Sequence, residues 1–180
     1  MTAALAPMWV TSRAAGITAL VLAGLSVSLG LLLGGRLLSF RGRAAELRAL
    51  HEVLALGTFA ALFVHGAALL ADPWLHPGLI GVLVPFAGAY RPLATGIGQI
   101  AALGLIGLGL THYARRRIGP ARWRRARRAI PIFWALAVVH GLTAGSDAMR
   151  PYYLLITLPV ILAALALLAA RWLRPAHSPA

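Results

Sequence analysis

Hydrophobic residues dominate this chain in five long stretches that are separated by short polar segments. Each stretch is long enough to cross the hydrocarbon core of a bilayer, which takes about 20 helical residues. The pattern predicts an all-α integral membrane protein, a bundle of five transmembrane helices that forms a single domain over residues 1–180. The predicted helices cover residues 13–35, 49–71, 93–114, 129–146 and 152–173.

Composition supports a membrane location and narrows the possible chemistry. Of the 180 residues, 60% are hydrophobic and 12% are charged, whereas soluble proteins average about 25% charged residues. The chain has no cysteine, which excludes disulfides, thiolate catalysis and cysteine-ligated iron–sulfur clusters. The first stretch has no basic segment before it and no convincing small-residue cleavage site, so we expect a retained helix rather than a signal peptide.

The basic residues lie mostly between the apolar stretches. All 17 are arginine, against four acidic residues, which gives a formal net charge of +13. Fourteen of them fall in residues 36–48, 115–128 and 171–180. The positive-inside rule then places the N-terminus outside and the C-terminus in the cytoplasm, in what we expect to be a bacterial inner membrane. Contact with anionic membrane lipids explains these segments better than nucleic-acid binding.

Histidines lie inside three of the apolar stretches, where spanning a bilayer does not require them. His51 and His65 are fourteen residues apart in the second stretch. An ideal helix turns about 1400° over that length and places them on nearly one face, about 21 Å apart. His140, near the outer end of the fourth stretch, is expected at the depth of His65. Two imidazoles at one depth on facing helices can provide both axial ligands of a b-type haem, so His65 and His140 are the predicted metal ligands.

An intramembrane histidine has other uses, and these alternatives stay open. It can be a hydrogen-bonded packing residue, a proton relay or part of a transport path. A haem-free histidine-dependent transporter and an accessory structural membrane subunit are therefore the competing functions. His112 lies at the cytoplasmic end of the third stretch, His76 in the external loop and His177 in the C-terminal tail, and we interpret these three as interfacial residues.

Several sequence segments together resemble the ferric reductase-like transmembrane domain family. This family includes the membrane domains of NADPH oxidases and metalloreductases and the haem subunit of bacterial methionine sulfoxide repair systems. The similarity covers nearly the whole chain and is greatest to small bacterial members that lack a flavin domain. The segments are SRAAGITALVLAGLSVSLG, the His51 and His65 pair, VPFAGAYRPLATGIGQIA, RRRIGPARWRRARR and VVHGLTAGSD.

The resemblance implies an outer haem held by His65 and His140, and an inner haem held by His51 and the residue thirteen before His140. That residue is Arg127, whose guanidinium stays protonated and is not an ordinary haem ligand. One haem b per chain is therefore expected. His51 is then a hydrogen-bonded interfacial residue, and Arg127 contacts a lipid phosphate or a backbone carbonyl. His112 is the alternative ligand for a second haem.

The predicted function is that of a membrane b-type cytochrome, an electron-transfer subunit related to ferric reductase-like oxidoreductases. Tyr90, Arg91 and Arg150 lie at the outer boundary and are the candidate partners of haem propionates. The glycine clusters LGGR and TGIGQ lie within or beside membrane helices and follow no strand, so no flavin or nicotinamide site is expected on this chain. The electron donor is then external, either the quinone pool or a separate flavoprotein, with the chain as one subunit of a larger system.

Overall fold

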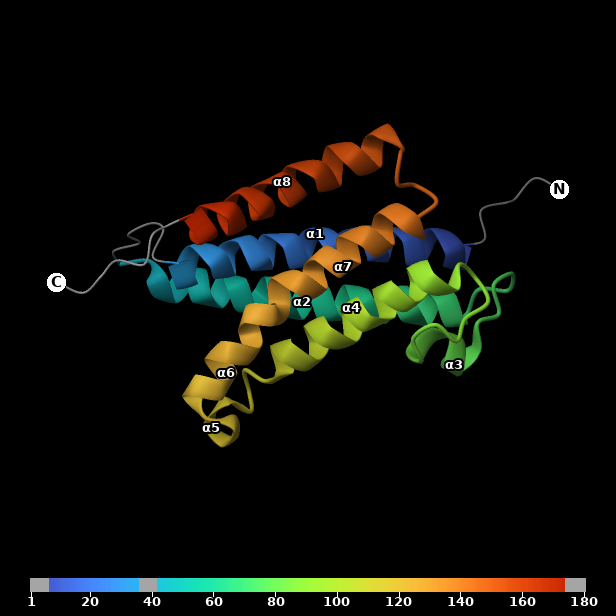
Figure 1. Ribbon diagram of the computed structural model, residues 1–180. Helices are drawn as coiled ribbons and strands as arrows, with labels where there is room; N and C mark the ends of the chain where they lie inside the picture. Colours follow the sequence, from blue (N-terminus) through green and yellow to red (C-terminus); the bar gives the residue numbers. More distant parts are fainter. Residues whose placement is uncertain (1–6, 36–41, 174–180) are drawn as a thin grey trace.

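The computed structural model describes residues 7–35 and 42–173, and every regular element within these ranges is a helix. The long helices run side by side, roughly along one axis (Figure 1). The prediction of an all-α fold is confirmed. The elements are α1 (Pro7–Gly35), α2 (Ala44–Leu70), α3 (Gly78–Leu83), α4 (Pro92–Leu110), α5 (Arg115–Ile118), α6 (Pro120–Ala126), the 3₁₀ helix η1 (Arg127–Ala129), α7 (Ile130–Thr143) and α8 (Pro151–Leu173).

Four of these helices are long and apolar enough to cross a membrane, namely α1, α2, α4 and α8. The predicted span over residues 129–146 corresponds to α7, which has 14 residues. At about 1.5 Å per residue it is about 21 Å long, shorter than a hydrocarbon core of about 30 Å. Pro131 lies in its first turn, where proline is tolerated because the N–H groups there have no helical acceptor. Membrane character is thus supported by four helices, and five complete spans stay a prediction.

The observed helix ends differ from the predicted ones by up to six residues. The first helix begins at Pro7 instead of residue 13, and the second at Ala44 instead of residue 49. Hydropathy marks where the apolar part of a helix ends, whereas helical hydrogen bonding continues into polar sequence. Glu46 lies in the first turn of α2, where its negative charge interacts favourably with the helix dipole.

Helix α1 is the centre of the bundle. It packs against α2, α7 and α8, while α4 packs against α7. Trp134 of α7, which is 2% exposed, is a central core residue. Small residues on α1 let the neighbouring backbones approach closely, as is usual between helices in lipid. The buried cluster consists of Leu20, Ala23, Val27 and Leu31 of α1, Trp134 of α7, and Tyr153 and Ala164 of α8.

The two ends of the bundle differ in character (Figure 1). One end, here called the N-terminal end, carries the start of α1, the α2–α4 connection with α3, and the α7–α8 connection. The other, the arginine-rich end, carries α5, α6, the end of α1 and the end of α8. The α2–α4 connection is held to α4 by Gln99, whose Nε2 donates to the carbonyls of Gly81 and Val82 at 2.6 and 3.0 Å.

Candidate functional site

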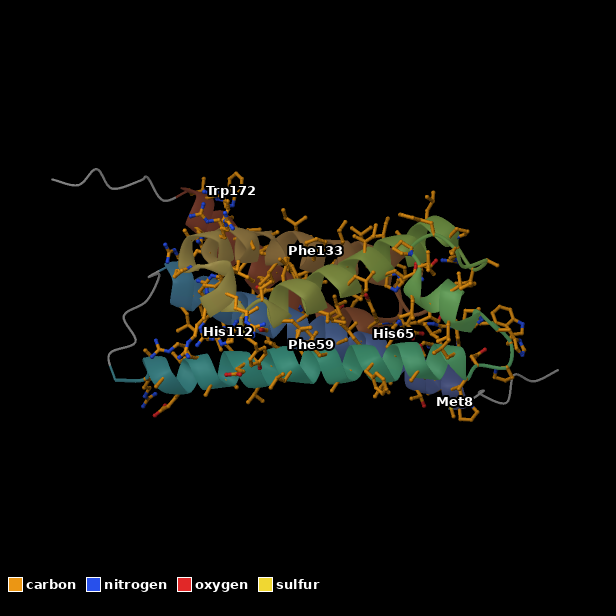
Figure 2. The ribbon with its side chains drawn as sticks, turned by 90° about the horizontal axis from the view of Figure 1, so that it is seen from below. Met8, Phe59, His65, His112, Phe133 and Trp172 are labelled. Atoms are coloured by element: carbon orange, nitrogen blue, oxygen red, sulfur yellow. The ribbon has the colours of Figure 1, made fainter. Side chains whose placement is uncertain are left out.

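The imidazole rings of His65 in α2 and His140 in α7 lie close together toward the N-terminal end of the bundle. Their ring centres are 6.5 Å apart and the ring planes are inclined by 75°. Figure 2 shows His65 toward the end that carries Met8, and His112 toward the end that carries Trp172. The structure thus brings together the two histidines for which the sequence predicts one depth.

A backbone carbonyl on a neighbouring helix fixes the orientation of each ring. Nδ1 of His65 lies 2.8 Å from the carbonyl oxygen of Ser12 on α1, and Nδ1 of His140 lies 2.8 Å from that of Ala94 on α4. A carbonyl oxygen can only accept a hydrogen bond, so Nδ1 carries the proton in both rings. Nε2 then keeps its lone pair, and this is the arrangement that metal-binding histidines commonly use.

His51 is held in the same way, fourteen residues earlier on α2. Its Nδ1 lies 3.0 Å from the carbonyl oxygen of Ser26 on α1. The side chain of each serine makes a second hydrogen bond to the same histidine residue. Ser12 Oγ donates to the backbone carbonyl of His65 at 3.2 Å, and Ser26 Oγ donates to that of His51 at 3.4 Å. Two equivalent serine–histidine pairs therefore join α1 to α2.

A glycine follows four residues after each of the three accepting carbonyls and leaves room for the ring. At Gly16 and Gly30 a Cβ atom would lie 3.1 and 3.2 Å from the nearest ring atom of His65 and His51, respectively. At Gly98 a Cβ atom would overlap the ring of the third histidine. The N–H of residue i+4 bonds to the carbonyl of residue i within a helix, so a side chain at that position would block the approach of an imidazole.

Sequence reasoning missed this pattern on α1, although the signal is present. Ser-x-x-x-Gly occurs at residues 12–16 and again at residues 26–30, and this repeat of fourteen matches the spacing of His51 and His65. Because α1 and α2 run antiparallel, equal spacing on the two helices aligns both pairs at once. Hydropathy contains no information about which helices are neighbours, and therefore does not reveal the match.

A cavity of about 810 Å³ lies beside the two rings and is lined by residues of α1, α2, α4, α7 and α8 and of the α2–α4 connection. Its lining is mainly alanine, glycine, leucine and aromatic residues, and its volume is within the range of about 300–1,000 Å³ that is usual for ligand sites. Tyr153 also borders the cavity and is 3% exposed. Its hydroxyl has no hydrogen-bond partner within the described part of the chain. An acceptor group on a bound ligand would satisfy it.

The three predicted propionate partners do not share one place. Tyr90 lines the cavity, and its hydroxyl donates to a backbone carbonyl at 3.4 Å. Arg91 does not line the cavity and donates to a carbonyl at the end of α7 at 2.6 Å. Arg150 lines a neighbouring pocket of about 480 Å³. Arg13 lines both spaces, and sequence reasoning did not identify it.

Among the residues that the structure describes, a second histidine pair does not form at the arginine-rich end. His51 is not among the residues that line the cavity. The ring of His112 packs on Trp123, with ring centres 5.9 Å apart, and a terminal nitrogen of Arg115 lies 2.6 Å from its Nε2. Arg127 also packs on the Trp123 ring, 4.7 Å from Cζ to the ring centre. No ring contact joins His51 to another histidine within residues 7–35 and 42–173.

The remaining histidines contribute little to the arrangement. His76 lies in the α2–α4 connection and borders the cavity, while His177 lies outside the described residues. Over the part of the chain that the structure describes, no three His, Asp or Glu side chains come together that could hold a metal ion by themselves.

Comparison with protein-family models, with curated proteins and with solved structures finds no match to this chain.

An ion pair adjoins the cavity at the N-terminal end. Nε of Arg13 donates to Oδ2 of Asp147 at 2.6 Å, and a terminal nitrogen of the same guanidinium pairs with Oδ1. This nitrogen also donates to the Tyr152 hydroxyl at 3.1 Å. The side chain of Asp147 is 8% exposed and that of Arg13 is 30% exposed. The pair links α1 to the α7–α8 connection.

We expect Arg13→Gln to lower the free energy of unfolding by about 1–3 kcal/mol, because a buried carboxylate would lose its partner. The figure is below that for a fully buried pair because Arg13 is partly exposed to solvent. Thermal unfolding in detergent measures the effect, and Arg150→Gln, in the same pocket but outside the ion pair, is the matched control. Equal losses in the two variants would contradict this role of the pair, whereas Arg13→Gln/Asp147→Asn should recover part of the loss.

Proposed function

We propose that this chain is a membrane b-type cytochrome that holds one haem between His65 and His140. The observation that carries the proposal is the separation of the two rings. Two metal–imidazole bonds of about 2 Å each, with about 1 Å from each nitrogen to its ring centre, require ring centres about 6 Å apart. The observed distance is 6.5 Å. The two rings are therefore at a spacing at which His65 and His140 could hold one haem iron.

The surroundings of the two rings fit the same cofactor. Both histidines donate through Nδ1 to a carbonyl, which leaves Nε2 as the ligand atom and holds the ring in place. The porphyrin supplies the other iron ligands, so two protein side chains suffice. The cavity of about 810 Å³ beside the rings is mostly apolar, as a buried macrocycle requires.

When bound, the haem would supply one-electron redox chemistry. The chain's own residues have the tasks of binding and shielding. His65 and His140 bind, the carbonyls of Ser12 and Ala94 orient them, and the apolar lining excludes water. Arg13 and Tyr90 line the cavity toward the N-terminal end, where they would meet polar groups of the cofactor. This function agrees with the resemblance to ferric reductase-like membrane domains, with a quinone or a separate flavoprotein as electron donor.

The proposal is limited to one haem per chain. His51 has an oriented imidazole, but Arg127 takes the place of the second family ligand and packs on Trp123. His112, the alternative ligand, accepts a hydrogen bond from Arg115 at Nε2. Neither side chain is arranged to complete an inner pair with His51.

An optical spectrum of the purified full chain tests the proposed function. We expect a Soret band, a reduced α-band of low-spin haem, and a haem-to-protein ratio near one. If the protein purified from cells supplied with a haem precursor is colourless, the proposal is contradicted, and a haem-free transporter or an accessory subunit is favoured instead. A ratio near two, with the second haem lost in His51→Ala, would show that the argument from Arg127 is wrong.

We propose further that the arginine-rich end faces the cytoplasm, as the positive-inside rule requires. A reporter fused after Ala180 should then behave as cytoplasmic, and one inserted near Gly78 of α3 as external. Paired fusions that are active on opposite sides of the membrane measure this directly. The inverse result would place the His65–His140 pair near the cytoplasmic surface and would change which donors can reach it.

A further inference from the structure

Two arginines from different helices converge at the arginine-rich end. A Cβ atom built on Gly34, in the last turn of α1, would lie 3.5 Å from a terminal nitrogen of Arg127 and 3.5 Å from a terminal nitrogen of Arg171. The two nitrogens are therefore separated by no more than twice that distance. Arg127 begins η1, and Arg171 lies in the last turn of α8. Both side chains reach the same point beside Gly34, which the absence of a Cβ leaves open.

This convergence places like charges together, and no salt bridge joins either arginine to an acidic side chain within residues 7–35 and 42–173. Within the described ranges the ion pair that forms is Arg13–Asp147, at the other end of the bundle. Glu52, an acidic residue of α2, accepts a hydrogen bond from Tyr113. The loss of solvent around its guanidinium, together with the charges of Arg171 and Arg124, lowers the pKa of Arg127. An anion bound between the two guanidiniums would offset the repulsion between their positive charges.

One of the two guanidiniums is held in place. Cζ of Arg127 lies 4.7 Å from the ring centre of Trp123, a distance at which a cation is attracted to the ring face. The carbonyl end of α1 carries only a partial negative charge, about half an elementary charge, and does not neutralise two full positive charges. Both arginines and Gly34 are exposed, so an anion can approach from outside the bundle.

We propose that Arg127 and Arg171 form a binding site for one phosphate group, carried by an anionic lipid. A planar guanidinium presents paired N–H donors that match phosphate oxygens, and two such groups can bind different oxygens of one phosphate. The site lies at the end of membrane-spanning helices, at the level where lipid headgroups are found. The residue that replaces a histidine of the resembled family would thus bind lipid. This inference does not depend on the presence of haem.

Native mass spectrometry of the full chain in detergent tests the site with phosphatidylglycerol as the probe. We expect wild type to retain one lipid. Arg127→Gln and Arg171→Gln should each weaken its retention about tenfold, since each removes charge-assisted hydrogen bonds. Together they should weaken it less than the product of the single effects, because both arginines bind one group. Arg128→Gln, an adjacent exposed arginine, is the matched control and should have little effect.

A second variant tests the geometry without changing the charge. Gly34→Leu should fill the space between the two guanidiniums and weaken retention by a similar factor, while circular dichroism verifies that the fold is kept. Titration with inorganic phosphate, in nanodiscs of phosphatidylcholine, distinguishes the source of the phosphate. Binding that depends on Arg127 and Arg171 would overturn the lipid assignment and make this a site for free phosphate. Equal losses in Arg127→Gln and Arg128→Gln would overturn the site altogether and show only diffuse attraction by the arginine-rich end.

Discussion

Replacing either His65 or His140 by alanine is expected to abolish the low-spin haem spectrum. The centres of the two rings are 6.5 Å apart, and in each ring Nδ1 bonds to a carbonyl, which leaves Nε2 available as a ligand. In the proposed cytochrome, loss of one ring would leave a single protein ligand for the iron, so haem would either be lost or bound in a high-spin form. The measurement is the haem-to-protein ratio and the reduced α-band, at equal amounts of folded protein.

His112→Ala is the control for this pair. His112 lies toward the opposite end of the bundle (Figure 2) and packs on Trp123, so the variant should keep wild-type haem content. Full retention of six-coordinate low-spin haem in His65→Ala or His140→Ala would eliminate that residue as a ligand. Loss of haem in His112→Ala would instead revive His112 as a ligand for a site near His51.

Gly98→Ala is expected to have the second largest effect, since it adds one methyl group where the His140 ring packs on α4. A Cβ atom at this position overlaps the ring, so the ring or the helix must move. The Nδ1 bond to the Ala94 carbonyl at 2.8 Å would then break. We expect loss of most of the haem that the proposed function assigns to this site, and a decrease in the free energy of unfolding of about 1–3 kcal/mol.

Gly107→Ala on the same helix is the matched control. Gly107 lies in the last turn of α4 and a Cβ atom there would meet nothing within 4 Å, while replacing a helical glycine by alanine stabilises a helix by about 0.5–1 kcal/mol at most. The two variants should therefore change stability in opposite directions. If Gly98→Ala keeps its haem and is as stable as Gly107→Ala, the close packing of His140 on α4 is not part of the site.

Hydropathy was sufficient to predict the helical class and the approximate positions of the long helices. It overestimated the length of the helix that carries His140. Residues 144–146 are apolar or small and were included in the predicted helix, whereas α7 ends at Thr143. Helix periodicity and depth were enough to select His65 and His140 as a pair. Both predictions depend on one helix at a time, and such properties are contained in local sequence.

The contacts between helices were not predictable in this way. The carbonyls of Ser12 and Ala94 orient the rings, but a backbone acceptor leaves no trace in the residue type. Arg13 was overlooked because its partner Asp147 is 134 residues away. Arg91 was assigned to the site from its depth, whereas its side chain caps the end of α7. Depth gives the position of a residue along the membrane normal. The direction in which its side chain points around the helix axis depends on which helices pack against it, and this is known only from the tertiary structure.

The two serine–histidine pairs also have a mechanical consequence for α1 and α2. In lipid, apolar helix faces are nearly equivalent, so packing alone distinguishes poorly between positions shifted by one turn. A slide of one turn, about 5.4 Å, would break the bonds of His65 and His51 together. Because the bonds are separated by about 21 Å along the axis, they also resist a change in crossing angle. His51 thus helps to set the alignment of the two helices, and this role does not require His51 to bind a cofactor.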